Sequence, residues 1–321
     1  MDVEQGYTHE LTNKIRAEIG KAVINQDELT DMALTALLSG GHVLIEGVPG
    51  LAKTLWVRAL ARAMDVRFKR VQFTPDLMPS DITGTKIYDM SGSRFELKRG
   101  PLFTNLFLAD EINRTPPKTQ SALLEVMEER SITIDGETHL MPEPFMVCAT
   151  QNPLEFEGTY PLPEALTDRF MMKLIMAYPG IAAEKTMLLR YNNGFEPKEL
   201  ESAGIAPVCG AGDAAALCRA EISRVRVDDG VLNYILSIVE TTRRIAVVSV
   251  GASPRASVAL LLTAKTFAAM RGRDFVIPDD VRDLALPVLR HRIILKPEAE
   301  LDGLKTDSVI ENILAQVKVP R

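Results

Sequence analysis

Two periods of apolar and polar residues alternate along the first half of the chain. Apolar residues recur at helical spacing over residues 10–24, 27–38 and 53–64. Short apolar runs, which are typical of buried strands, lie at residues 42–46, 68–73, 106–109 and 145–150. Strands that alternate with helices of this length indicate βαβ units. We therefore predict an α/β fold in which helices cover both faces of a parallel sheet.

Two stretches interrupt this alternation. Residues 86–98 alternate in polarity around residues 90–93, and residues 131–140 alternate around Asp135 and Gly136. An Asp-Gly pair is a strong signal of a tight hairpin turn. Since a βαβ core needs neither hairpin to be complete, we expect both β-hairpins to be insertions that project from it.

Helical spacing dominates the second half. One buried helix face is predicted from apolar residues at positions i, i+3, i+4, i+7 and i+8, namely Val231, Tyr234, Ile235, Ile238 and Val239. Ser253 and Pro254 are the residue types expected at an N-cap and at the first position of a helix. Pro278 opens a further predicted helix in the same way.

The length and composition agree with a folded chain of two domains. At about 100–200 residues per domain, 321 residues suggest two domains. We place the boundary near residue 180, which gives an α/β domain (1–180) and a helical domain (181–321). Apolar residues make up 46% and charged residues 25%, which excludes wholesale disorder. The net charge of −6 argues against nucleic acid as a partner, because a broad basic surface is lacking.

The expected location is the cytoplasm. Cys148, Cys209 and Cys218 are odd in number and lack metal-ligand spacing, which favours a reducing compartment. The acidic and polar start of the sequence is unlike a signal peptide. The most apolar stretch, residues 256–270, contains polar residues and is shorter than the roughly 18 residues of a spanning helix. We therefore expect a soluble protein without a membrane span.

A glycine-containing loop joins the apolar run 42–46 to the helical stretch 53–64. In such a strand–loop–helix context, backbone N–H groups and the helix N-terminus bind phosphate, as in a Walker A loop. Lys53 is expected to reach the β and γ phosphates of ATP, and Thr54 to ligate Mg²⁺. The candidate nucleotide-binding residues are Gly47, Val48, Pro49, Gly50, Leu51, Ala52, Lys53, Thr54 and Leu55. An ordinary glycine-rich turn is the alternative.

Ala52 departs from the usual form of this loop, which has glycine before the lysine. A methyl group is tolerated there if the residue has right-handed helical dihedral angles, but it would clash if φ were positive. The backbone conformation at this one position therefore decides how well alanine fits.

A second motif ends the apolar run 106–109, where Asp110 and Glu111 follow. Because the carboxyl ends of parallel strands meet at one edge of a sheet, both carboxylates are expected beside the phosphate loop. Asp110 would hold Mg²⁺ and its water shell, and Glu111 would orient and polarise the attacking water. A surface turn with acids at a helix N-terminus is the alternative. Together with the loop, the motif predicts an ATPase.

Four motifs in this order resemble those of MoxR-type AAA+ ATPases. They lie at residues 47–54, 110–114, 149–153 and 168–170. Alanine before the lysine is itself part of this resemblance, because the family's loop looks the same at this position. The resemblance covers about residues 18–292 and implies an AAA+ P-loop core with inserted hairpins, followed by an all-α lid domain. It further implies a hexameric ring with ATP and Mg²⁺ at each subunit interface. The implied role is chaperone-like maturation of partner proteins, often ones with a von Willebrand factor A domain.

The resemblance assigns roles to residues outside the loop. Asn152 matches sensor 1, whose amide can hydrogen-bond both the γ-phosphate and the attacking water; an asparagine that caps a turn is the alternative. Arg169 matches the arginine finger that reaches into the neighbouring subunit, unless it only pairs with Asp168 locally. Val23 and Ile24 resemble the segment that contacts adenine, although two aliphatic residues are also ordinary core.

Arg255 matches sensor 2, and here the sequence adds a physical argument. Arg255 lies two residues after the N-cap candidate Ser253, in the first turn of a predicted helix. A cation in that turn opposes the helix dipole at a cost of up to about 1 kcal/mol. An anion would relieve the conflict, so a phosphate of ATP is one candidate partner and a nearby acid is the other.

Three other functions stay open. The ATPase subunit of a magnesium chelatase belongs to a related ring with hairpins, although the loop with Ala52 fits the MoxR type better. A nucleotide-gated scaffold with little turnover is disfavoured by the presence of Glu111 and Arg169. A DNA-remodelling motor is disfavoured by the acidic charge balance and by the lack of a helix-turn-helix or an aromatic–basic stripe.

Overall fold

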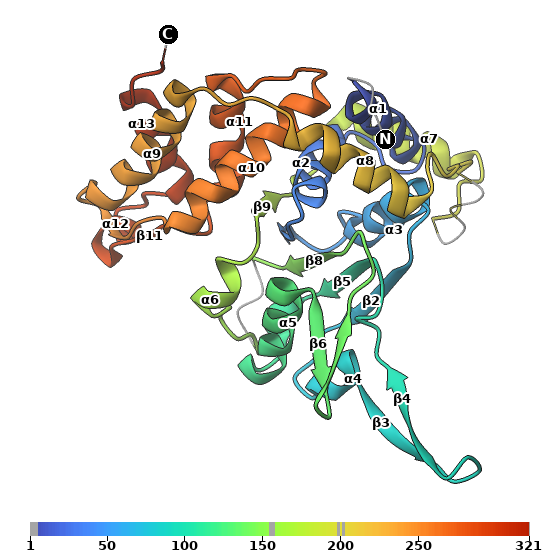
Figure 1. Ribbon diagram of the computed structural model, residues 1–321. Coiled ribbons are helices and arrows are strands. Elements are labelled where there is room, and N and C mark those ends of the chain that lie inside the picture. Colours follow the sequence, from blue (N-terminus) through green and yellow to red (C-terminus); the bar gives the residue numbers. More distant parts are fainter. Residues whose placement is uncertain (1–5, 154–157, 198–199, 201–202, 321) are drawn as a thin grey trace.

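The computed structural model describes residues 6–153, 158–197, 200 and 203–320. Within these residues the centre is a five-stranded parallel sheet with the strand order β2-β5-β8-β1-β9 (Figure 1). Its strands are β1 (Val43–Glu46), β2 (Phe68–Gln72), β5 (Leu106–Asp110), β8 (Met146–Gln151) and β9 (Met172–Ile175). The four predicted strands are confirmed. The edge strand β9 was missing from the prediction and pairs with β1.

Alternate residues of the central strands point into two separate apolar cores, because side chains change face at every residue of a strand. Leu106 and Cys148 share one core with the helices α1 (Tyr7–Gly20), α2 (Asp27–Leu38) and α3 (Lys53–Ala63). Phe107 and Ala149 share the other with α5 (Pro117–Glu129). Figure 1 shows α1–α3 above the sheet and α5 below it. Burial on both faces explains why these strands appear in the sequence as continuous apolar runs.

The predicted helix over residues 10–24 ends too late. In the structure α1 ends at Gly20, and Asn25 takes a left-handed backbone conformation with φ of 56°. Leu11, Ile15 and Ile19 form the buried face of α1, and Val23 is buried as well. Val23 thus continues the four-residue spacing although it lies outside the helix, so the period alone could not locate the helix end.

Both predicted hairpins are confirmed. Strands β3 (Gly84–Asp89) and β4 (Arg94–Arg99) pair antiparallel, as do β6 (Ser131–Ile134) and β7 (Glu137–Leu140). The first hairpin follows the short helix α4 (Pro79–Thr83) and projects from the body of the molecule (Figure 1). Lys86 of this hairpin lies 2.8 Å from a carboxylate oxygen of Glu137, which links the two hairpins.

The second half is mainly helical. Its helices are α6 (Glu164–Thr167), α7 (Ile181–Asn192), α8 (Ala211–Ser223), α9 (Asp229–Arg244), α10 (Pro254–Met270), α11 (Pro278–Leu289), α12 (Pro297–Leu301) and α13 (Thr306–Gln316). The predicted buried face of α9 and the predicted starts of α10 and α11 are confirmed. A short antiparallel pair, β10 (Val248–Val250) and β11 (Ile294–Leu295), is an addition to the expected all-helical lid. Across the part of the chain that the structure describes, none of the helices has the length and apolar character to cross a membrane.

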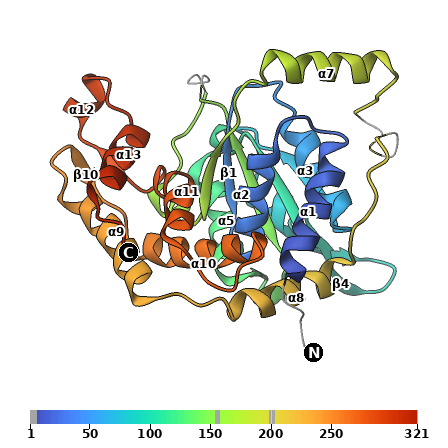
Figure 2. The same cartoon turned by 90° about the horizontal axis from the view of Figure 1, so that it is seen from above.

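Helix α7 stands apart from the other helices (Figure 2). The structure describes all of its residues, and none of them is buried. Its C-terminal half is tied to the end of α1, because Arg190 donates hydrogen bonds to the carbonyl oxygens of Gly20, at 3.1 Å, and Lys21. A cation at the C-terminal end of a helix is a favourable arrangement.

Candidate functional site

The loop between β1 and α3 needs glycine at two positions. A Cβ atom on Gly47 would lie 2.9 Å from the carbonyl oxygen of Met176, which is closer than a side chain tolerates. Gly50 has φ of 87°, in the left-handed region that favours glycine. The loop therefore turns tightly onto the N-terminus of α3, where N–H groups and the helix dipole favour an anion.

Ala52 adopts the conformation in which a methyl group is unfavourable. Its φ of 59° and ψ of 26° are left-handed, and it occupies the N-cap position of α3. For a residue with a Cβ atom this region costs roughly 1–2 kcal/mol. Alanine is thus retained here at a local cost that the rest of the loop sustains.

The ammonium group of Lys53 lies within the loop. It donates hydrogen bonds to the carbonyl oxygens of Gly47, at 2.5 Å, and Val48, at 3.3 Å. Burial lowers the pKa of Lys53, and the nearby carboxylates of Asp110 and Glu111 oppose that shift. A half-buried cation among carbonyl groups is well placed to interact with phosphate oxygens.

One buried hydroxyl joins the two acids at the end of β5. Thr150 of β8 donates to Asp110 Oδ1 at 2.5 Å and accepts from the backbone N–H of Glu111 at 2.8 Å. Glu111 itself has a left-handed φ of 56°. Such a conformation is uncommon for glutamate and is held here by its neighbours, as is frequent at functional sites.

Strand β2 and the turn after β5 contribute contacts that the sequence analysis did not single out. Arg70 Nε donates to Asp110 Oδ2 at 2.9 Å, and Gln72 Nε2 donates to Glu111 Oε2 at 2.7 Å. Arg114 Nε lies 2.9 Å from the same glutamate oxygen. A sequence signal did exist, since Gln72 lies at the carboxyl end of a strand predicted to belong to the same sheet and Arg70, two residues earlier, shares its face.

The phosphate loop and the two acids meet in one cavity of about 480 Å³. The described residues that line it are Pro49, Gly50, Leu51, Ala52, Lys53, Thr54, Leu55, Arg58, Asp110, Glu111, Asn152, Tyr191 and Pro197. The structure therefore brings the phosphate loop, the two acids and Asn152 together from the carboxyl ends of β1, β5 and β8. This is the edge at which ligands bind to open α/β sheets.

A second, mostly apolar cavity of about 250 Å³ shares part of the loop with the first. Val23 and Ile24 line one side, and α7 lines another with Ala183, Met187 and Tyr191. An apolar slot beside a phosphate-binding loop fits the base of a nucleotide. The sequence analysis did not assign α7 to the site. The sequence signal for this helix was the four-residue spacing of residues 183, 187 and 191, which places them on one helix face.

Arg169 and Arg255 lie elsewhere. Neither is among the described residues that line the two cavities. Both contact Glu128 at the end of α5: Arg169 Nε donates to Glu128 Oε2 at 2.9 Å, and Arg255 Nη2 donates to Glu128 Oε1 at 2.9 Å. Hydrogen bonding to Arg169 holds the pKa of Glu128 below its ordinary value. Asp168 Oδ2 also lies 3.6 Å from Arg255 Nη1, so the anions that relieve the dipole conflict at Arg255 are carboxylates of this chain.

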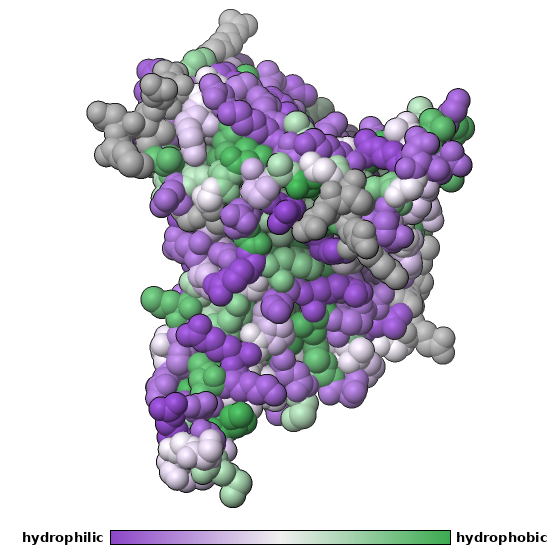
Figure 3. Space-filling view, turned by 90° about the vertical axis from the view of Figure 1, so that its right-hand side faces the viewer, coloured by the Kyte–Doolittle hydropathy of each residue, from purple (hydrophilic) through white to green (hydrophobic). Residues whose placement is uncertain are grey.

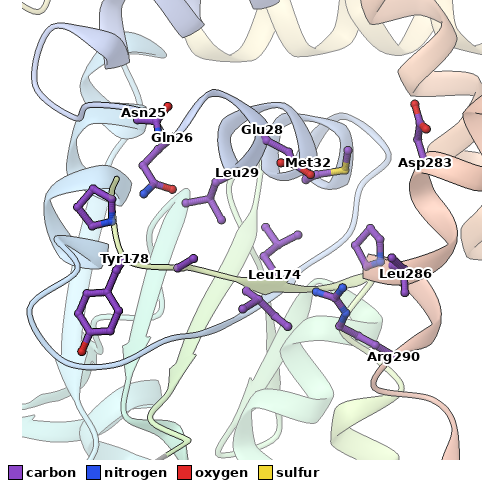
Figure 4. Close-up of a pocket in the computed structure, with 14 residues that line it drawn as sticks. Asn25, Gln26, Glu28, Leu29, Met32, Leu174, Tyr178, Asp283, Leu286 and Arg290 are labelled. Carbon is purple, nitrogen blue, oxygen red and sulfur yellow. The ribbon is translucent and has the colours of Figure 1, made fainter. Parts of the chain in front are cut away.

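A further cavity, of about 360 Å³, adjoins the apolar slot (Figure 4). It lies between the start of α2, the segment after β9 and α11. Gln26, Tyr178 and Pro179 line both this cavity and the slot. Asp283 of α11 and Arg290, which directly follows α11, line its other side (Figure 4). The cavity therefore connects the apolar slot to the helices of the second half.

The fold and the site define a P-loop ATPase of the AAA type. A family model described as "ATPase family associated with various cellular activities (AAA)" matches residues 42–172, and one described as "AAA lid domain" matches residues 240–313. The solved structure of a candidate ATPase from Cytophaga hutchinsonii superimposes with a TM-score of 0.89 and is 42% identical. That match covers 98% of this chain and 96% of the other.

Curated relatives give the family more narrowly. Chaperone MoxR1 of Mycobacterium tuberculosis is 43% identical over 95% of this chain and 81% of its own length. The uncharacterised YeaC of Bacillus subtilis is 47% identical over 97% and 96%. The chain belongs to the MoxR family of AAA+ ATPases. The predicted family and the predicted fold, an AAA+ core with a lid, are confirmed.

Proposed function

We propose that this protein hydrolyses ATP in a Mg²⁺-dependent reaction and uses the turnover for chaperone-like remodelling or maturation of partner proteins. The observation that carries the proposal is the cavity in which the phosphate loop, two strand-end carboxylates and Asn152 meet, next to an apolar slot. Membership of an ATPase family supports the same chemistry.

The residues of the cavity divide into binding and catalytic groups. Lys53 and the loop N–H groups would bind the phosphates, and the slot lined by Val23, Ile24 and α7 would take the base. The Thr54 hydroxyl and the Asp110 carboxylate form the small oxygen-donor set that Mg²⁺ uses together with substrate phosphates. When bound, Mg²⁺ would offset the negative charge that develops on the phosphate oxygens.

Glu111 and Asn152 are the candidates for positioning the attacking water. The backbone of Glu111 is fixed by the hydroxyl of Thr150, and its carboxylate is held by Gln72 and Arg114. A carboxylate held in this way can accept a hydrogen bond from water and orient it. The Asn152 amide offers both donors and an acceptor, so it can contact the γ-phosphate and the water together.

The arginines suggest a shared site. Arg169 and Arg255 contact Glu128 rather than the cavities of their own chain, so we assign both to the nucleotide of a neighbouring subunit. An arginine finger of this kind is worth about 10³–10⁵ in rate. A ring, which the family resemblance implies to be a hexamer, would supply such a neighbour to every site. We keep residues 1–180 as the nucleotide-binding domain and 181–321 as the lid.

The projecting hairpin β3–β4 is the candidate surface for a client protein. Its exposed side chains include Ile87, Tyr88, Met90 and Phe95, whose exposed fractions range from 48% to 87%. Figure 3 shows hydrophobic surface among polar surface on this hairpin, at the bottom of the view. Exposed apolar side chains on a projection are suited to gripping another protein. We propose a protein with a von Willebrand factor A domain as the client.

The test is the rate of Mg-ATP hydrolysis per subunit as a function of protein concentration, with Lys53→Ala as the inactive control. We expect the specific rate to rise with concentration until assembly is complete, because each site needs a neighbour. A sizing column run in parallel identifies a ring that is already saturated. Absence of hydrolysis at every concentration, with and without a von Willebrand factor A domain protein, would refute the proposed activity.

A further inference from the structure

One carboxylate holds two arginines that lie far apart in the sequence. Glu128 lies in the last turn of α5, Arg169 follows α6, and Arg255 lies in the first turn of α10. Glu128 Oε2 accepts from Nε and Nη2 of Arg169, whereas Oε1 accepts from Nη2 of Arg255. Each carboxylate oxygen thus serves a different arginine, and the two guanidinium groups are held side by side.

The backbone beneath Arg169 is fixed as well. Arg169 Nη1 donates to the carbonyl oxygen of Ala165 at 2.6 Å. The adjacent Asp168 is anchored by the buried Arg292, whose Nε donates to Asp168 Oδ1 at 2.9 Å. Arg292 also donates to the carbonyl oxygen of Phe170 at 2.8 Å. Arg169 therefore has a rigid base, and its side chain is held by Glu128 together with the carbonyl oxygen of Ala165.

We propose that Glu128 is the positioning residue that presents Arg169 and Arg255 as a pair to the nucleotide of the neighbouring subunit. The proposal rests on the proposed function, since it needs the two arginines to act on a second chain. Two like charges held side by side repel each other, and a carboxylate between them offsets that repulsion.

Both arginines keep N–H donors that are not used in the contacts with Glu128 and Ala165. A guanidinium group has five N–H donors, and the contacts with Glu128 and Ala165 use three donors of Arg169. The contact between Arg255 and Glu128 uses one donor of Arg255. Both arginines can therefore bind phosphate oxygens without leaving Glu128.

The net charge of the cluster also agrees with phosphate binding. Asp168 belongs to the same cluster, because its Oδ1 lies 2.9 Å from Arg292 and its Oδ2 lies 3.6 Å from Arg255. Three arginines (169, 255 and 292) and two carboxylates (128 and 168) leave one positive charge. The cluster thus retains a net attraction for a phosphate.

The test combines Glu128→Gln with a matched control, Glu129→Gln. Both side chains are exposed and lie next to each other at the end of α5, so the two variants remove the same charge from the same helix end. We expect Glu128→Gln to lower kcat about tenfold without changing the affinity for ATP, and Glu129→Gln to keep the wild-type rate. A wild-type or a raised rate in Glu128→Gln would overturn the positioning role.

Mixed rings separate positioning from a general structural defect. Lys53→Ala subunits lack a working pocket but carry intact arginines, and Glu128→Gln subunits have the reverse defect. If Glu128 acts on the neighbour, mixing the two should restore a rate above the sum of the separate rates. A slow Glu128→Gln variant that Lys53→Ala subunits cannot complement would overturn the proposal.

The arginine variant distinguishes this proposal from the function on which it rests. Arg169→Ala mixed with Lys53→Ala should show the same complementation. A wild-type rate in Arg169→Ala would refute the shared site and the role of Glu128 with it. A slow and complemented Arg169→Ala beside an active Glu128→Gln would refute only the role of Glu128.

Discussion

The hydroxyl of Thr150 offers a sharp test of how the acids are held. Thr150→Val keeps the shape of the side chain and removes only the hydroxyl. Thr150 is 1% exposed, so water cannot easily replace the lost group. The substitution leaves Asp110 Oδ1 without the 2.5 Å hydrogen bond and the N–H of Glu111 without the 2.8 Å hydrogen bond.

The size of the effect follows from these two contacts. A hydrogen bond to a charged group contributes about 1.5–3 kcal/mol, and a buried N–H left without a partner costs about 1–3 kcal/mol. The extra methyl group of valine returns part of this through its apolar burial, at about 25 cal/mol per Å². We expect a net loss of about 2–4 kcal/mol in the free energy of unfolding.

The assay is chemical denaturation of Thr150→Val beside Thr150→Ser, which keeps the hydroxyl and loses a methyl group. The serine variant should lose only about 0.5–1.5 kcal/mol. The valine variant should also hydrolyse ATP about tenfold more slowly, because the backbone of Glu111 is no longer fixed. A valine variant within 0.5 kcal/mol (about the uncertainty of such measurements) of the wild type, or a serine variant as unstable as valine, would refute the reasoning.

Three further outcomes are expected. Ala52→Gly should raise the free energy of unfolding by about 0.5–1 kcal/mol, because the relief of the left-handed strain exceeds the cost of glycine's added freedom in the unfolded chain. A lower denaturation midpoint would contradict this. Lys53→Ala should abolish ATP binding in calorimetry, whereas Glu111→Gln should bind ATP and lose at least about 99% of turnover. Burial lowers the pKa of His42 to about 4, so between pH 6.5 and pH 4 the ring binds a proton in the unfolded chain but not in the folded one. The free energy of unfolding should therefore be highest above pH 6.5 and fall by roughly 3 kcal/mol as the pH drops to 4. In NMR spectra its ring should stay neutral from pH 8 to pH 5, and titration near pH 6.5 would show that the ring is exposed.

The sheet was predictable because its strands are buried on both faces and therefore appear as unbroken apolar runs. Strand β9 lacks this signal. It is an edge strand that contains Lys173, whose ammonium group lies 2.7 Å from a carboxylate oxygen of Glu46 on β1. This lysine interrupts an otherwise apolar stretch, residues 170–176, so the strand does not appear as an unbroken apolar run.

The phosphate loop and the acids were predictable for a different reason. Their chemistry is encoded in short segments whose position relative to the strands is local, so the parallel sheet brings them together. The contributions of Met187 and Tyr191 were not predictable in this way, because their spacing marks a helix face but not what that face contacts, and α7 reaches the site only through tertiary contacts. Whether a methyl group is strained at position 52 could not be decided from the sequence, because it depends on the backbone dihedral angles of Ala52.

For Arg255 the sequence predicted the need for an anion but not which anion it is. A cation in the first turn of α10 needs an anion, and this much follows from the sequence, since the helix dipole acts within one turn. The identity of the anion is not a local property. Glu128 reaches Arg255 from α5 while it holds Arg169, so the charge conflict that pointed to phosphate is met by a carboxylate within the chain. In the proposed shared site, the phosphate that Arg255 binds belongs to a second chain and uses the donors that Glu128 leaves free, which would couple assembly to turnover.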